Sequence, residues 1–147
     1  MSLNGSVAHA ASSPFGVQNI FRLPSNGAGV PSGLITNNQG GIARPTRLYF
    51  VLGMVINTYP LYLKLYDKAS APVVGTDTPK LTLGLTSNTV YNGSSVIAAP
   101  LGFEFSFNDV GVSFVNGIAY AITKLAPDAD TTAILAGDVT GLNIGWQ

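Results

Sequence analysis

The chain contains no cysteine and far less charge than most soluble domains. The absence of cysteine excludes disulfides, thiolate catalysis and cysteine-ligated zinc, so the redox compartment cannot be inferred. Asp, Glu, Lys and Arg make up 10% of the 147 residues, against about 25% in an average soluble domain. Seven basic and seven acidic residues cancel to a formal net charge of zero. Because little charge keeps copies apart, we expect the protein to self-associate.

The sequence also lacks a basic footprint and a hydrophobic run of membrane-spanning length. Without a basic patch, we expect no binding to nucleic acid. The longest apolar run, Leu48 to Ile56, falls far short of the roughly 20 residues that a membrane helix needs. Met1 to Gly16 shows neither a basic start nor an apolar core segment, so we expect no secretory signal. These absences predict a soluble protein with no membrane partner.

What the sequence does contain is strand patterning, most clearly from Leu61 to Leu85. Leucines alternate with other residues in LYLKLY and again in LTLGL, which is the period-two pattern of a strand with one buried face. The residues between these segments favour turns and interrupt strand pairing. They include Asp67, Pro72, Gly75, Asp77 and Pro79. The stretch therefore predicts two strands joined by a loop.

Further strand candidates lie on both sides of this stretch. Thr46 to Asn57 is the longest, and because it is apolar on both faces we predict a central strand. Gly53 within it indicates a bulge or a close approach of backbone. Leu101 to Phe107 alternates Phe with Gly, Glu and Ser, and is the clearest strand pattern in the chain. Ser87 to Ala99 reads as a loop with a tight-turn signal at its Asn-Gly pair.

Three later segments complete the set of predicted strands: Val110 to Val115, Ile118 to Thr123 and Val139 to Trp146. In total the pattern predicts an all-β fold, a single sandwich of about 7–8 short antiparallel strands at the spacing typical of sandwiches. A jelly-roll-like strand order is favoured, although an immunoglobulin-like order satisfies the same spacing.

Residues 1–45 differ in composition from the rest of the chain. They are rich in Gly, Ser, Asn, Ala and Pro, and Arg22 and Arg44 are their only charged residues. We expect an extended, low-charge N-terminal arm over residues 1–45 and a β-sandwich domain over residues 46–147. A mobile arm is one interpretation, and we expect disorder before about residue 14 unless a partner holds the chain. Past that point an arm docked against a neighbouring subunit is favoured, because apolar residues recur at intervals. They are Phe15, Val17, Ile20, Phe21 and Leu23.

No group of residues forms a recognisable catalytic or metal-binding motif. The single histidine, His9, lies in the arm without partners for a metal site or a triad. Asp128 and Asp130 are two positions apart, but a calcium loop needs 6–8 oxygen ligands, so a turn-forming role is favoured. Glu104 has no carboxylate neighbour with which to form an acid–base pair. We expect no enzymatic activity, no catalytic residues, no metal and no cofactor.

The most suggestive surface is a stripe on one face of the first leucine-rich strand, formed by Tyr62, Lys64 and Tyr66. Tyrosine is enriched at protein interfaces because it is large, fairly rigid and amphipathic. An ordinary solvated strand face would show the same pattern, and both interpretations stay open. The predicted subunit interface consists of these three residues and of Phe15, Phe21 and Arg22 in the arm.

Five short segments together carry a family resemblance. They are Lys64 to Pro72 (KLYDKASAP), Gly75 to Pro79 (GTDTP), Gly117 to Thr123 (GIAYAIT), Asp128 to Thr132 (DADTT) and Gly137 to Val139 (GDV). This pattern resembles a group of small β-sandwich virion proteins of tailed bacteriophages. The resemblance covers roughly residues 46 to 147 and leaves the arm uncovered. Its motifs are turn-and-strand patterns, which indicate fold better than role.

The resemblance implies a structural virion protein, a decoration (cement) protein on the outer surface of the phage capsid. Such proteins often form homotrimers between capsomers, so the implied partners are the major capsid protein and further copies of this chain. A cement protein would bury surface across several capsid subunits and so oppose internal genome pressure. A tail or neck accessory protein is one alternative. A host-glycan-binding protein is another, and it would use Tyr59, Tyr62, Tyr66 or Trp146.

Overall fold

The computed structural model describes residues 19–37, 45–85 and 89–147, which form strands and no helix. One sheet has the order β1-β11-β3-β8, and a short fifth strand, β9, extends the pairing of β3. Its strands are β1 (Asn19–Ser25), β11 (Val139–Trp146), β3 (Thr46–Val55), β8 (Leu101–Ser106) and β9 (Val112–Phe114). The second sheet has the order β2-β10-β4-β5. Its strands are β2 (Ser32–Asn37), β10 (Gly117–Thr123), β4 (Leu61–Asp67) and β5 (Leu81–Leu85).

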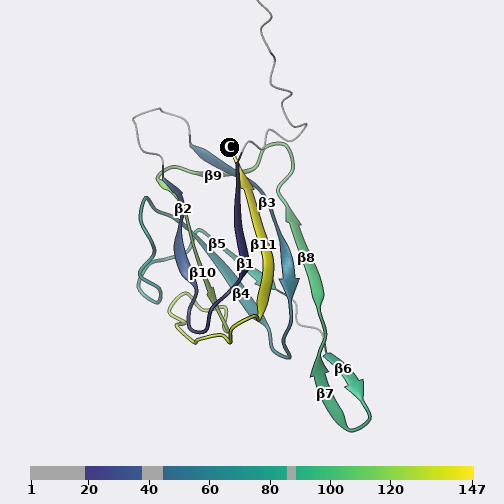
Figure 1. Cartoon of the computed structure of the whole chain (residues 1–147). Helices are drawn as coiled ribbons and strands as arrows, with labels where there is room; N and C mark the ends of the chain where they lie inside the picture. The colour runs from purple at the N-terminus through teal and green to yellow at the C-terminus, as the bar shows by residue number, and fades with distance from the viewer. Residues whose placement is uncertain (1–18, 38–44, 86–88) are drawn as a thin grey trace, which may run out of the picture.

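The two sheets form separate layers with a core between them (Figure 1). Every strand pair in both sheets is antiparallel. The leucines at 61, 63 and 65 that mark β4 in the sequence are fully buried, and Phe103 of β8 is 9% exposed. The prediction of an all-β antiparallel sandwich is therefore confirmed.

The strand pairing is nested along the chain. β1 pairs with β11, β2 with β10, β3 with β8, and β4 with β5. The first four strands alternate between the two sheets, so each connection crosses from one layer to the other. Nesting of this kind is typical of a jelly roll, in which eight strands wind into two sheets.

The predicted central strand, β3, pairs with β11 on one side and with β8 and β9 on the other. Gly53 lies opposite a bulge in β11, where the register shifts between Thr140 and Asn143. Gly141 in this bulge has a φ of 58°, which glycine adopts without steric cost. A Cβ at Gly53 would lie 2.7 Å from the Phe103 ring and 3.2 Å from the Leu142 Cα of the neighbouring backbone. The predicted close approach at Gly53 is confirmed, and the bulge belongs to the neighbouring strand.

The prediction that the sandwich begins at Thr46 is wrong, because residues 19–25 and 32–37 form strands within it. β1 is the edge strand of the first sheet and β2 is the edge strand of the second. Phe21 and Leu23 of β1 pack against the core. The alternation in NIFRLPS was the available signal, but the surrounding glycine and proline suggested an arm. The rest of the predicted arm, residues 1–18 and 38–44, lies outside the described residues.

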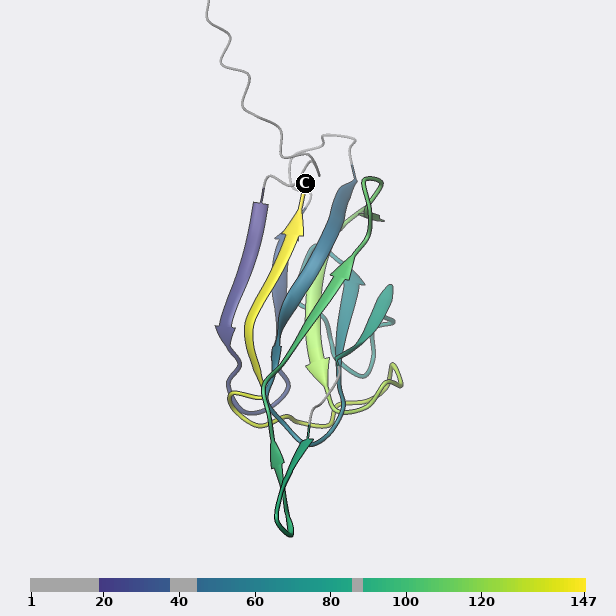
Figure 2. The ribbon, with the colours of Figure 1, turned by 90° about the vertical axis from the view of Figure 1, so that its right-hand side faces the viewer.

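The predicted loop at residues 87–99 contains a β-hairpin that sequence analysis missed. β6 (Thr89–Asn92) and β7 (Ser95–Ala98) pair with each other, Asn92 opposite Ser95. The two-residue turn between them starts at Gly93, whose φ of 67° suits the tight turns of hairpins. The hairpin projects beyond the sandwich at the end opposite the C-terminus (Figures 1 and 2).

Candidate interaction surfaces

The predicted stripe on β4 faces away from the leucine core, but two of its three residues are buried. Lys64 and Tyr66 are 0% exposed and Tyr62 is partly buried. Two loops cover this outer face of the second sheet. Val74 of one loop packs against the buried cluster of Tyr66, Ala119 and Ala121, and the Pro127 carbonyl of the other accepts a hydrogen bond from Lys64. The prediction of an accessible contact stripe is therefore wrong for Lys64 and Tyr66.

Lys64 ties the covering loop to the sheet. Its Nζ donates to the carbonyl oxygen of Pro127 at 2.6 Å and of Asp130 at 3.4 Å. Burial lowers the pKa of Lys64, and the negative charges of Asp130 and Asp128 only partly oppose this. The Lys64 side chain therefore holds the loop against the sheet through hydrogen bonds to main-chain carbonyl groups of the loop.

The loop that contains Pro127 also shows what Asp130, one member of the acidic pair, does. The Asp130 carboxylate accepts hydrogen bonds from the main-chain N–H groups of Leu125 at 2.9 Å and Thr132 at 3.1 Å. These bonds confirm the turn-forming role expected for Asp130. Among the described residues, no group of three or more His, Cys, Asp or Glu side chains could hold a metal ion.

The predicted interface residues of the arm lie in different environments. The Phe21 ring packs against Tyr120, with ring centroids 5.3 Å apart, so Phe21 belongs to the core of its own chain. Phe21 is only partly buried there, so its contact with a neighbouring subunit stays a prediction. Arg22 follows it in β1 and is exposed on the outer face of the first sheet. Phe15 lies outside the described residues.

That outer face of the β1-β11-β3-β8 sheet carries apolar side chains that reach solvent. Leu52 is 37% exposed, Met54 38% and Ile20 61%. The Phe50 ring lies over Gly145, where it fills the space that a Cβ would need. A hollow of about 260 Å³ lies on this face beside Phe50 and Leu52. It is lined by Tyr49, Phe50, Leu52, Glu104, Ser106 and Asn108. This surface could not be identified from sequence, because the same alternation would fit a face covered by loops.

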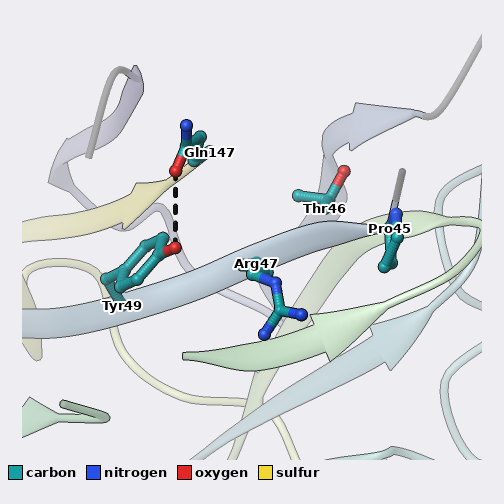
Figure 3. A pocket seen from close by; sticks show the side chains of 5 residues that line it. All are labelled: Pro45, Thr46, Arg47, Tyr49 and Gln147. Atoms are coloured by element: carbon teal, nitrogen blue, oxygen red, sulfur yellow. Dashed lines mark hydrogen bonds between the residues drawn. The ribbon is translucent and has the colours of Figure 1, made fainter. Parts of the chain in front are cut away.

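A second hollow, of about 380 Å³, lies beside the last residue of the chain (Figure 3). Pro45, Thr46, Arg47, Tyr49 and Gln147 line it. The Tyr49 hydroxyl points toward Gln147 Oε1, 3.4 Å away, whereas Arg47 extends away from both. Arg47 donates from Nη1 to the Val110 carbonyl at 2.6 Å. Among the described residues of the lining, no His, Asp, Glu or Lys is present to act as a general base for the Thr46 or Tyr49 hydroxyl.

The end of the sandwich where β11 begins is closed by a network of internal hydrogen bonds. Asp138 is 5% exposed and accepts hydrogen bonds from the Tyr59 hydroxyl and from the N–H of Leu135. Burial and the Asp138 carboxylate raise the pKa of Tyr59 to about 12. The Lys124 ammonium lies 4.2 Å from the centre of the Tyr59 ring. Because the polar groups of Asp138 and Tyr59 already bind each other, this network is structural.

The β6–β7 hairpin is the most prominent projection from the body of the protein (Figure 2). Its sequence, TVYNGSSVIA, carries no charge, and Ile97 is 46% exposed. Among the described strands, β6 and β7 pair only with each other. An isolated two-stranded hairpin is only marginally stable in water, and its unpaired edges can accept a strand from another protein. The hairpin therefore has the properties of a contact element.

Comparison of the chain with protein-family models, with curated proteins and with solved structures finds no match. No helix in the described part of the chain is long and apolar enough to cross a membrane.

Proposed function

We propose that the chain is a structural virion protein that decorates a phage capsid and binds the major capsid protein through its β6–β7 hairpin. The family resemblance supplies the virion role. The low charge and the sandwich core suit a protein that works by contact rather than catalysis. The protein would lie on the outer surface of the capsid, where it would oppose the pressure of the packaged genome.

The observation that carries the proposed contact is the uncharged hairpin that projects from the sandwich. A capsid subunit that pairs with a hairpin edge would satisfy its exposed main-chain groups and order a marginal element. Each of its strands has four residues, so the hairpin alone covers much less than the roughly 1,200 Å² of a stable interface. It would therefore anchor a larger contact that includes neighbouring loops.

A particle assay tests the role. Virions assembled without the protein are heated or osmotically shocked, and DNA release is compared with that from complete virions. We expect release at lower temperature without the protein, and restoration when purified protein is added back. Equal resistance of the two particles would contradict the cement role.

A point substitution tests the hairpin. Ile97→Asp adds a charge to the hairpin, and we expect it to abolish binding to depleted particles while the sandwich unfolds at the same temperature. Val110→Asp is the matched control, because Val110 is 71% exposed and lies in the loop between β8 and β9. Normal binding by the Ile97 variant would remove the hairpin from the contact.

A tail or neck accessory protein would share these features, and the position of the protein in a particle map distinguishes it. The glycan-binding alternative has little support from the aromatic residues proposed for it. Tyr66 is buried, Tyr59 is bonded to Asp138, and Trp146 packs against the core. Only Tyr62 is left, and glycan-array binding that disappears in Tyr62→Ala would favour this alternative.

A further inference from the structure

The two outer faces of the sandwich differ in how they are covered. On the second sheet, all seven residues of β10 are buried, because loops lie over the face that points away from the core. On the first sheet, β8 alternates between exposed residues and residues that are buried or partly buried, and apolar side chains of β3 reach solvent. This outer face of the β1-β11-β3-β8 sheet is called the open face below.

The register aligns residues of all four strands of the open face in rows, although the bulge in β11 adds one residue to β1 and β11 between the middle row and the row of Met54. The middle row runs Arg22, Asn143, Leu52, Glu104. The rows on either side run Ile20, Gly145, Phe50, Ser106 and Ser25, Thr140, Met54, Gly102. Directly opposed residues of antiparallel strands project from the same face. An apolar strip on β3 therefore runs between polar or small residues.

Arg22 and Glu104 are the only charged residues in these three rows, and they occupy opposite ends of the middle row. Arg22 is on edge strand β1 and Glu104 is on β8, three strand spacings away, or about 14 Å. Both are exposed, and neither forms an ion pair within the described part of the chain. Each edge of the open face thus presents one unpaired charge, and the two charges lie at the same position along the strand direction, which is called height here.

We propose that the open face binds the open face of a second copy of this chain, about a two-fold axis parallel to the strands. Rotation about that axis exchanges the two edges of the sheet and preserves height along the strands. Arg22 then faces the partner's Glu104, and Glu104 faces the partner's Arg22. An axis perpendicular to the strands would instead place like charges together, which disfavours it.

The same rotation fits the uncharged residues. It lays β3 over the partner's β11, so that Leu52 faces Asn143 and Met54 faces Thr140. The large apolar side chains of one copy thus meet shorter side chains of the other. Sheets that pack with nearly aligned strands normally lie about 10 Å apart, a separation that Arg and Glu side chains can bridge together. The contact is isologous, and two copies close it.

The size of the open face sets the strength of the contact. Four strands about 4.8 Å apart and about seven residues long give a footprint of roughly 450 Å² per copy. The total of roughly 900 Å² lies below the size of stable interfaces and within the range of transient ones. We therefore expect a reversible dimer with a Kd on the order of 1–100 μM.

This dimer does not depend on the virion role. A homotrimer, which the family resemblance implies, would need a heterologous contact between two different surfaces. The open face pairs with itself and would not supply that contact.

Sedimentation equilibrium of the full-length chain tests the inference over about 1–500 μM. The monomer mass is 15.2 kDa, and we expect a concentration-dependent rise to twice that value. Arg22→Glu and Glu104→Arg should each weaken dimerisation at least about tenfold, because each creates two like-charge contacts per dimer. The double variant exchanges the charges, and its Kd should return to within about threefold of the original.

Thr78→Arg is the matched control, because it adds a charge to an exposed site on the loop between β4 and β5 and should leave the Kd unchanged. Circular dichroism and thermal unfolding establish that each variant is folded. A monomer at every concentration, a trimer mass, or a double variant weaker than either single variant would overturn the inference. A dimer that neither single substitution weakens would equally overturn it.

Discussion

Buried Lys64 leads to a prediction about how stability changes with pH. Replacing it by Met keeps an unbranched apolar stem of similar length and removes the ammonium group. In the folded chain this group is removed from water and donates to the main-chain carbonyls of Pro127 and Asp130. Burial therefore lowers the pKa of Lys64 from its ordinary value of 10.5. The Met variant has no such group to titrate.

The sign of the effect follows from proton linkage. Between the lowered pKa and 10.5, the unfolded chain binds more protons at Lys64 than the folded chain, so the wild type gains stability as pH rises. One proton limits the slope to about 1.4 kcal/mol per pH unit. The wild-type free energy of unfolding should therefore rise relative to that of Lys64→Met across this alkaline window. Tyrosine titrations occur in both proteins and cancel in the difference.

Urea unfolding of both proteins at pH 6 to 10.5 measures this difference directly. Lys80→Met serves as the control for loss of a lysine, because the Lys80 side chain is 38% exposed. A difference between wild type and Lys64→Met that stays constant with pH would show that the ammonium titrates as it does in water. If the wild-type free energy of unfolding instead fell relative to that of Lys64→Met as pH rose, the reasoning would be refuted, because such a fall requires a raised pKa of Lys64.

Three further predictions concern stability. Leu63→Ala should lower the free energy of unfolding by about 2.7–5 kcal/mol, because Leu63 is fully buried, and urea unfolding measures this; a loss below about 1 kcal/mol would contradict its place in the core. Gly53→Ala should cost about 1–3 kcal/mol because its Cβ would meet the Phe103 ring, whereas Gly27→Ala, with open space around it, serves as a control that should cost less. At Asp67, burial raises the pKa, but hydrogen bonds from main-chain N–H groups and from Lys80 outweigh it and lower the pKa. The stabilisation by Asp67 is present above about pH 3.8 and is lost as pH falls through the lowered pKa. Asp67→Asn should therefore weaken the dependence of the free energy of unfolding on pH in the acid range, measured by urea unfolding. An unchanged dependence would contradict this.

Period-two alternation predicted most of the sandwich, because a strand with one buried face must alternate. It succeeded for the leucines of β4 and the phenylalanines of β8, where apolar and polar positions differ clearly. It failed at residues 19–37, where glycine and proline surround two short strands. It also missed the hairpin at residues 89–98, although the Asn92-Gly93 pair marked its turn.

The candidate surfaces were harder to predict, because they depend on contacts between distant segments. Alternation places Lys64 and Tyr66 on the face opposite the leucines, but it does not show that loops fold over that face. The row from Arg22 to Glu104 depends on three strand pairings and on a bulge at Gly141. One residue of slippage in any pairing would turn one of the two charges to the opposite face of the sheet.

The nested topology has a consequence for how the chain comes to fold. β11 lies between β1 and β3, although more than a hundred residues separate β1 from β11 along the chain. During translation β3 can pair with β8 and β9, but β1 has no neighbour to join in its sheet until residues 139–146 have left the ribosome. The pairing of β1 with β11, and of β11 with β3, should therefore form late and slowly, because distant segments must meet. Until β11 has paired, β1 and one edge of β3 are exposed and can aggregate with other chains.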